Sequence, residues 1–218
     1  GALMGQGFGL EHALWFADSA DDAHEDPTFE RNRSHDYVAR EVAAVQHNVG
    51  GIEIANFAKH ELKGAGARAY LDHMLAGVVP KAGRLTLTPM LTPKGKLYGD
   101  LTVACLADDH FMLFGSGVMQ DAHRRWFEKQ LPNNVSYANV SDEWHGIALS
   151  GPKSRALLAD LMRDDISRMK FRDLWQTYVA GVPVLLNRIS FSGELGFEIY
   201  CRPPYLIRLA EAIETAGA

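Results

Sequence analysis

A short unit that occurs twice limits the fold of this 218-residue chain more than any other feature of its sequence. Residues 62–71 (LKGAGARAYL) reappear as residues 149–158 (LSGPKSRALL), and each of the five matching residues lies 87 positions after its counterpart. In both copies an apolar stretch ends in Leu, a Gly permits a turn, and apolar residues then recur three and four positions apart, as on one face of a helix. We therefore predict a strand–turn–helix unit that is used twice.

Each predicted helix is followed by two segments with the alternating pattern of β-strands. Residues 84–90 and 97–103 flank a turn at Pro93 and Gly95, whereas residues 182–190 and 197–200 flank a turn at Gly193. Short connections of this kind join antiparallel strands. The pattern predicts an α+β protein with antiparallel sheets.

The N-terminal part has a different character. Residues 20–33 are rich in Asp, Glu, His and Arg, which indicates an exposed loop. Ser34 is then expected to cap a helix that carries Val38, Val42 and Val45 on one side and ends at Gly50. We expect this amphipathic helix to lead into the body of the fold.

Composition excludes several classes of function. The formal net charge of −5, without a basic stripe, disfavours nucleic acid as a partner. No apolar run approaches the roughly 20 residues of a membrane helix, and the nine histidines lack metal-ligand spacing. Cys105 and Cys201 stand apart in apolar strands, which indicates reduced core residues, so we expect a soluble protein of the cytoplasm or the mitochondrial matrix. Because Gly comes first and a helical pattern reaches the last residues, we also expect a fragment of a longer protein.

Two carboxylates occupy similar positions in the two halves. Gly95-x-Leu97-x-x-Asp100-Leu101 corresponds to Gly193-x-Leu195-x-x-Glu198-Ile199, 98 positions later. We hypothesise that the two acids face one cleft, although most charged side chains are simply exposed on a surface. A carboxylate pair can act as general acid and base, and a carboxylate can equally accept two parallel N–H bonds from a planar heterocycle.

Several ordered motifs add a resemblance to this pattern: GLEHALWFA (9–17), REVAAV (40–45), MLTPKG (90–95), GDLTV (99–103) and SGELGFE (192–198). Together they resemble the folate-binding half of dimethylglycine and sarcosine dehydrogenases, which shares the fold of the glycine-cleavage T-protein. The resemblance implies two interleaved ferredoxin-like subdomains, formed by residues 1–50 plus 138–218 and by residues 51–137. The C-terminal β-barrel of the family is not expected within this chain.

The resemblance also implies a tetrahydrofolate site. Asp100 matches the aspartate held essential for transfer, and Glu198 matches the glutamate that grips the pterin. Ser116 stands where an Asn is common and Phe191 where a stacking Tyr is usual, and we place Tyr98 with them among the cofactor-binding residues. No metal is expected.

The implied reaction begins with a flavin domain upstream, outside this chain, which holds FAD and oxidises an N-methyl amine to an iminium. Tetrahydrofolate then captures the one-carbon unit as methylenetetrahydrofolate. Three alternatives stay open: a folate-dependent demethylase or aminomethyltransferase of the same fold, a non-catalytic folate-binding relative, and a purely structural module that docks onto the flavin domain.

Overall fold

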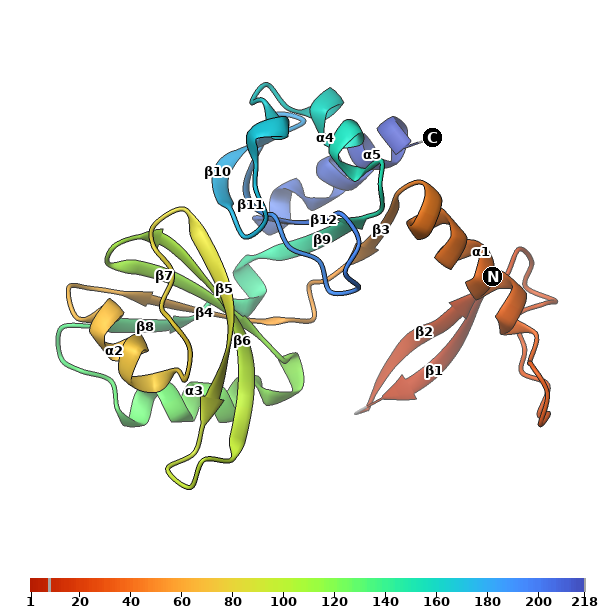
Figure 1. Ribbon diagram of the computed structural model, residues 1–218. Helices are drawn as coiled ribbons and strands as arrows, with labels where there is room; N and C mark the ends of the chain where they lie inside the picture. Colours follow the sequence, from red (N-terminus) through yellow and green to blue (C-terminus); the bar gives the residue numbers. More distant parts are fainter. Residues whose placement is uncertain (8, 218) are drawn as a thin grey trace.

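The computed structural model describes residues 1–7 and 9–217, and two five-stranded antiparallel sheets form its body (Figure 1). The middle sheet has the order β5-β6-β7-β4-β8, with β4 (Ala58–Lys63), β5 (Arg84–Leu91), β6 (Leu97–Ala107), β7 (His110–Gly115) and β8 (Ser136–Asn139). The flanking sheet has the order β10-β11-β12-β9-β3, with β3 (Gly50–Glu53), β9 (His145–Ser150), β10 (Leu174–Val179), β11 (Val182–Asn187) and β12 (Gly196–Cys201).

Each sheet is covered by two helices on one face. Helices α2 (Ala67–Met74) and α3 (Gln120–Lys129) enclose one apolar core with the middle sheet, while α4 (Ser154–Leu161) and α5 (Leu206–Gly217) enclose another with the flanking sheet. The repeated unit is confirmed as β4–α2 and β9–α4. Its glycines, Gly64 and Gly151, both adopt the left-handed backbone (φ 128° and 125°) that the predicted turn requires.

The uncovered faces of the two sheets pack against each other. Leu85 and Phe114 of the middle sheet share an apolar cluster with Leu185 and Tyr200 of the flanking sheet. The sheets also meet at their edges, where β5 and β10 approach through an antiparallel bridge between Arg84 and Asp173, whose side chains form an ion pair. We call the region between the facing sheets the inter-sheet interface.

The two halves are interleaved in sequence. Strand β3 pairs with β9 and takes the place beside it that β8 takes beside β4, so a strand from the N-terminal part completes the C-terminal sheet. The chain thus passes from the flanking sheet to the middle sheet between Glu53 and Ala58, and it returns to the flanking sheet between Asn139 and His145. The division into folding units at residues 51 and 137 stays a prediction.

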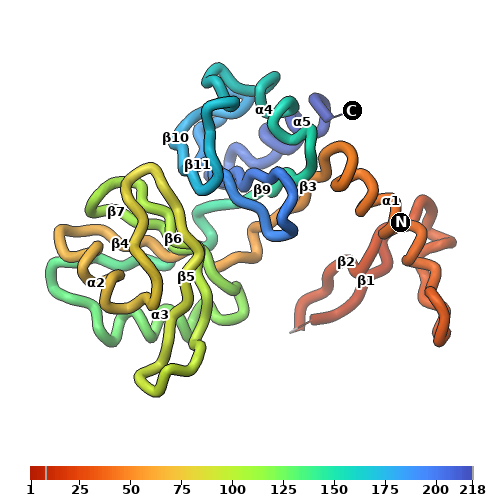
Figure 2. The backbone as a smooth tube through the Cα atoms, viewed as in Figure 1, coloured from red at the N-terminus to blue at the C-terminus, as the bar shows by residue number. Residues whose placement is uncertain are grey.

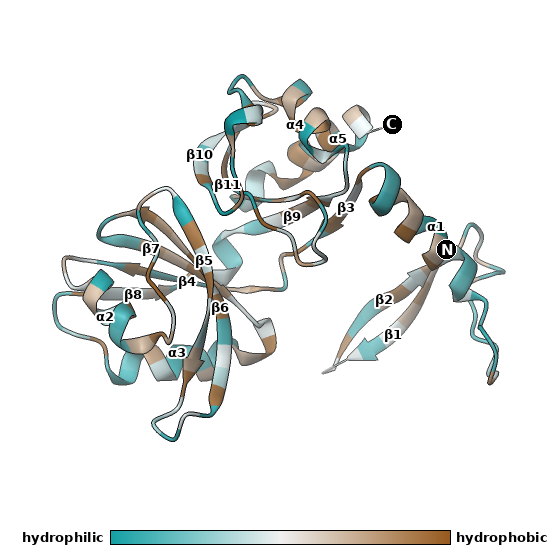
Figure 3. Ribbon diagram, in the orientation of Figure 1, coloured by the Kyte–Doolittle hydropathy of each residue, from teal (hydrophilic) through white to brown (hydrophobic). Residues whose placement is uncertain are grey.

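The N-terminal hairpin, β1 (Ala2–Gly7) and β2 (Leu10–Phe16), and helix α1 (Ser34–His47) project from this body (Figure 2). Trp15 is buried against Tyr37 of α1, with ring centroids 5.2 Å apart, so it anchors the hairpin to the helix. Hydrophobic and hydrophilic residues mix along both elements (Figure 3).

Helix α1 differs from its prediction at both ends and in its packing. Ser34 is the first helical residue rather than the cap, and the helix ends at His47 because Gly50 already begins β3. None of the residues of α1 is buried, so its valine stripe does not enter the core. None of the helices in the described ranges is long and apolar enough to cross a membrane.

Candidate functional site

Asp100 and Glu198 lie on the faces of their sheets that form the inter-sheet interface. On β6, Leu101 and Val103 point into the core under α2 and α3, so by alternation Asp100 shares the opposite face with Ala104, which belongs to the inter-sheet cluster. On β12, Phe197 and Ile199 point toward α4 and α5, so Glu198 shares the opposite face with Tyr200.

Glu198 is a largely desolvated carboxylate with one oxygen held in place. The Tyr200 hydroxyl donates a hydrogen bond to Glu198 Oε2 at 3.0 Å. Burial raises the pKa of Glu198, and the Tyr200 hydroxyl acts in the opposite direction because it stabilises the ionised form. The Asn187 side chain acts in the same direction as the Tyr200 hydroxyl. The carboxylate is half-buried and can still meet a ligand that donates N–H groups.

Asn187 lies beside this carboxylate, because it is the cross-strand partner of Glu198 in β11. Its side chain is completely buried, yet neither Oδ1 nor Nδ2 has a hydrogen-bond partner of normal geometry within residues 1–7 and 9–217. Buried amides are nearly always paired. Glu198 and Asn187 therefore form a polar pair, in which the Asn187 amide favours the ionised carboxylate.

Ser116 directly follows β7, the strand that pairs with the strand of Asp100. The β6–β7 ladder ends at the pair Thr102–Phe114, and Asp100 and Ser116 each lie two residues beyond this pair. Ser116 keeps extended backbone angles (φ −64°, ψ 126°) and is exposed, as is Asp100. Both residues thus lie at the same end of the β6–β7 ladder.

An aromatic stack joins the carboxylates of the two sheets. The rings of Phe114 and Tyr200 lie 4.4 Å apart with an interplanar angle of 27°. Asp100 belongs to the strand that pairs with Phe114, whereas Glu198 accepts the hydrogen bond of Tyr200. Asp100 and Glu198 therefore face the inter-sheet interface from opposite sheets.

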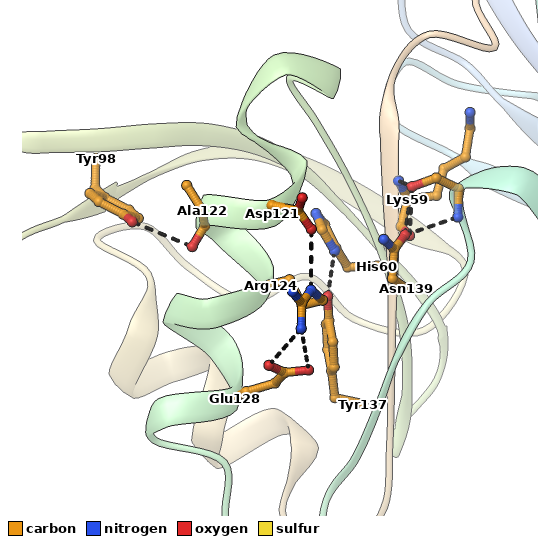
Figure 4. A network of polar contacts seen from close by, with 10 residues as sticks. Lys59, His60, Tyr98, Asp121, Ala122, Arg124, Glu128, Tyr137 and Asn139 are labelled. Atoms are coloured by element: carbon orange, nitrogen blue, oxygen red, sulfur yellow. Dashed lines mark hydrogen bonds and ion pairs between the residues drawn. The ribbon is translucent and has the colours of Figure 1, made fainter.

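Tyr98 lies on the other side of the middle sheet. The pairing of β5 with β6 shifts between Met90–Gly99 and Leu91–Leu97, so Tyr98 is an extra residue in a bulge. Its ring packs on Trp126 of α3 at 4.5 Å between centroids, and its hydroxyl donates to the Ala122 carbonyl at 3.4 Å (Figure 4). In this structure Tyr98 supports the strand from behind and does not share the face of Asp100.

Phe191 stands apart from the other predicted residues. It lies in the loop between β11 and β12 and is 98% exposed, so its ring packs on no other part of the described chain. The structure leaves it without contact to the inter-sheet interface.

The 98-residue offset that suggested equivalent carboxylates does not follow the structural repeat. Asp100 lies on the second strand of the middle sheet and Glu198 on the third strand of the flanking sheet. The two strands both follow a glycine turn, which explains the similar local sequences. The acids face one interface because the sheets face each other, not because they are symmetry mates.

Sequence reasoning missed Asn187, Tyr200 and Lys59. Asn187 ends an otherwise apolar strand and Tyr200 follows Glu198 by two positions, so both carried a weak signal of a polar pair. Lys59 carried none: it is fully buried in β4, its ammonium donates to the carbonyls of Ala55 and Phe57 at 2.7 and 2.8 Å, and burial lowers its pKa to about 8. It holds the linker that connects the two sheets.

The arrangement suits recognition of a flat polar heterocycle better than metal binding. No group of three or more His, Cys, Asp and Glu side chains within the described ranges is placed to hold a metal ion. A half-buried carboxylate that a tyrosine hydroxyl holds in place can bind paired N–H groups. Across the interface, an exposed carboxylate can accept a proton or offset a positive charge.

Comparison with known proteins places the chain among the aminomethyltransferase-like domains. It matches the model of the GCVT N-terminal domain over residues 1–218 and belongs to that family. It is 33% identical over 219 residues to human "Dimethylglycine dehydrogenase, mitochondrial", a match that covers 98% of this chain and 25% of the relative. It is 32% identical over 183 residues to the aminomethyltransferase of Anoxybacillus flavithermus, covering 83% of this chain and 50% of the relative.

Solved structures show the same fold. The glycine cleavage system aminomethyltransferase T from Bartonella henselae superposes with a TM-score of 0.79 at 21% identity, over 98% of this chain and 53% of that one. A chain of the heterotetrameric sarcosine oxidase from Corynebacterium sp. U-96 gives a TM-score of 0.61 at 19% identity, over 87% and 95%. The predicted α+β fold with antiparallel sheets is confirmed. The chain spans about a quarter of the dimethylglycine dehydrogenase and about half of the aminomethyltransferase.

Proposed function

We propose that this chain is a tetrahydrofolate-binding module that captures the one-carbon unit of an iminium as methylenetetrahydrofolate, within a dimethylglycine or sarcosine dehydrogenase-like protein. Bound tetrahydrofolate would supply the amine nitrogens that take up the one-carbon unit. The observation that carries the proposal is the placement of Asp100 and Glu198 on the two facing sheets, with Glu198 half-buried and held by the Tyr200 hydroxyl.

Glu198 is assigned to cofactor recognition. A pterin presents neighbouring N–H donors along one edge, and a carboxylate that is fixed by Tyr200 can accept them without losing side-chain freedom at binding. The buried carboxamide of Asn187 lies beside this carboxylate and favours its ionised form. The residues present therefore fit a bound pterin.

Asp100 is assigned to catalysis. In the transfer, the iminium carbon would bond to two folate nitrogens, the demethylated amine would leave with one of the two displaced N–H protons, and the positively charged nitrogen would have to lose the other. An exposed carboxylate on the opposite side of the interface can offset that charge and accept the proton. Ser116, its neighbour, can donate a hydrogen bond to the same carboxylate or to the ligand. Phe191 would join the site only if its loop closed over the ligand.

We propose further that a flavin domain outside this chain, with its own FAD, generates the iminium from a methylated amine. We also propose a location in the mitochondrial matrix or the cytoplasm.

The first test is calorimetric titration of the chain with 5-formyltetrahydrofolate, a stable reduced folate. We expect saturable binding that weakens by at least about tenfold in Glu198→Gln, since a neutral amide accepts N–H bonds less strongly than a carboxylate. Glu211→Gln, an exposed change on α5, is the matched control and should bind like the wild type. Absence of saturable binding to the wild-type chain would contradict the proposal.

A further inference from the structure

His123 of α3 is a buried imidazole that has no assigned role. Only 1% of the residue is exposed, and both ring nitrogens lack a hydrogen-bond partner of normal geometry in the part of the chain that the structure describes. Leaving a buried polar group unsatisfied destabilises the folded state, and an apolar side chain of similar size would avoid that cost. Space filling alone therefore does not account for a histidine at this position.

The ring fits into a slot that two glycines create on the helix-covered face of the middle sheet. A Cβ atom at Gly99 of β6 would lie 2.4 Å from His123 Nε2, which is too close for any residue other than glycine. A Cβ atom at Gly115 of β7 would lie 3.4 Å from His123 Nδ1. The imidazole thus rests directly on the backbone of two adjacent strands.

The two glycines directly precede two of the candidate site residues. Gly99 is followed by Asp100 and Gly115 by Ser116, and side chains of successive residues point to opposite faces of a strand. The ring of His123 is consequently the layer immediately behind Asp100 and Ser116. Because the ring lies against this backbone, a shift of the ring toward or away from the sheet would displace both strand segments perpendicular to the sheet.

We propose that His123 is a positioning residue for the candidate site, whose imidazole sets the backbone of β6 and β7 at Gly99 and Gly115 and thereby the placement of Asp100 and Ser116. This inference rests on the proposed function for its meaning, but its central prediction is a coupling within the protein that needs no folate.

The coupling is electrostatic as well as steric. Burial lowers the pKa of His123, and the backbone of Tyr98 and the charge of Asp100 act against that lowering. The other titratable groups packed on the ring are His60 of β4, whose ring centroid is 6.3 Å away, and the Tyr98 ring at 5.9 Å. Asp100 is therefore the acid whose removal should change the titration of His123.

The decisive experiment follows the imidazole ¹⁵N signals of His123 by NMR as a function of pH, in the wild-type chain and in Asp100→Asn. We expect the titration of His123 to move to lower pH in Asp100→Asn, because the carboxylate that favours the imidazolium is gone. Asp160→Asn, an exposed change on α4, is the matched control and should leave it unchanged. Identical titrations in all three proteins would overturn the inference.

A second variant separates positioning from simple packing. His123→Leu should unfold at the same or a higher temperature, since it removes unsatisfied buried nitrogens. It should nevertheless shift the backbone amide signals of Asp100 and Ser116 and leave those of β10–β12 in place. In the transfer reaction we expect kcat to fall about tenfold or more while folate affinity holds, because small misplacements of a catalytic group are costly.

Unchanged amide signals and unchanged kcat in His123→Leu would show that the ring only fills space. If the wild-type chain binds no folate, the proposed function fails. The effect of Asp100→Asn on the NMR titration of His123 still decides this inference.

Discussion

The Tyr200 hydroxyl helps to set the pH at which Glu198 carries a charge. Its hydrogen bond to Oε2 opposes the effect of burial, which raises the pKa of the carboxyl. Because only the ionised form accepts two N–H bonds, folate affinity should be lost as pH falls through this raised pKa, at a higher pH than for an ordinary glutamate.

Tyr200→Phe keeps the ring that stacks on Phe114 but removes the hydroxyl. We expect the pKa of Glu198 to rise further, so that folate affinity begins to fall at a higher pH than in the wild type. The free energy of unfolding should drop by roughly 1 kcal/mol for the lost hydrogen bond. Calorimetric Kd values between pH 5 and 8 measure the first effect. Tyr178→Phe, an exposed tyrosine on β10, is the control, and equal pH dependence in all three proteins would refute the role of the hydroxyl.

For individual residues, the sequence indicated the charged side chains of the candidate site but not the buried side chains that pack beside them. Asp100 and Glu198 stood out because carboxylates in alternating strands are visible as a pattern. Asn187 and His123 are noteworthy because their side chains are buried without a hydrogen-bond partner of normal geometry in the described chain. Burial depends on residues far away in the chain, so the sequence does not show it. Phe191 could be matched to a stacking position, but no pattern determines how its loop lies.

Among the elements, the strands were more predictable than the turns and bulges that orient their side chains. Alternation in residues 97–103 placed Tyr98 on the face of Asp100, whereas the bulge beside Leu91 moves it to the opposite face. Bulges depend on the partner strand, so a single strand's pattern does not show them. The β10–β11 hairpin illustrates the same limit, because its two-residue turn forces Ala180 into the left-handed region (φ 51°) before Gly181 (φ 76°).

Ala180→Asn should therefore stabilise the protein. Two-residue hairpin turns with both central residues at positive φ favour Asn-Gly, and an L-residue such as Ala loses about 1 kcal/mol in that conformation. We expect the free energy of unfolding, measured with urea, to rise by about 0.5–1 kcal/mol. Gly181→Ala serves as the opposite control and should destabilise the chain. A neutral or destabilising Ala180→Asn would show that the turn is held by contacts outside the hairpin, such as the bond from the Ala180 amide to the Leu161 carbonyl.

For the whole molecule, the sequence predicted the duplicated unit but only part of the interleaving of the two halves. The offset of 87 between the strand–turn–helix units is a local signal, and the structure confirms both copies. The exchange of β3 into the flanking sheet joins residues 50–53 to residues 147–150, almost a hundred positions later. No local pattern specifies such a pairing, and the family resemblance implied interleaved subdomains without assigning β3 to the flanking sheet.

Acid should destabilise the whole molecule through histidines that are buried without charge. His60 of β4 is fully buried, its Nδ1 lies 2.8 Å from the Tyr137 hydroxyl (Figure 4), and burial together with the nearby His123 lowers its pKa to about 4. Between this pKa and the value near 6.5 of the unfolded chain, the unfolded state binds more protons, so stability is full above about pH 6.5 and is lost as pH falls toward 4.

From pH 7 to pH 5 this single group should remove about 2 kcal/mol of unfolding free energy. Glu198 acts in the opposite sense, because its raised pKa makes the native state bind the proton first. His60→Leu should lower stability at pH 7, since Tyr137 loses its partner, but it should reduce the difference between pH 7 and pH 5 by about 2 kcal/mol. His47→Gln, an exposed histidine at the end of α1, should leave that difference unchanged. If urea unfolding gives His60→Leu the same pH dependence as the wild type, the acid sensitivity arises elsewhere. The neighbouring His123 is then the next group whose titration should be measured.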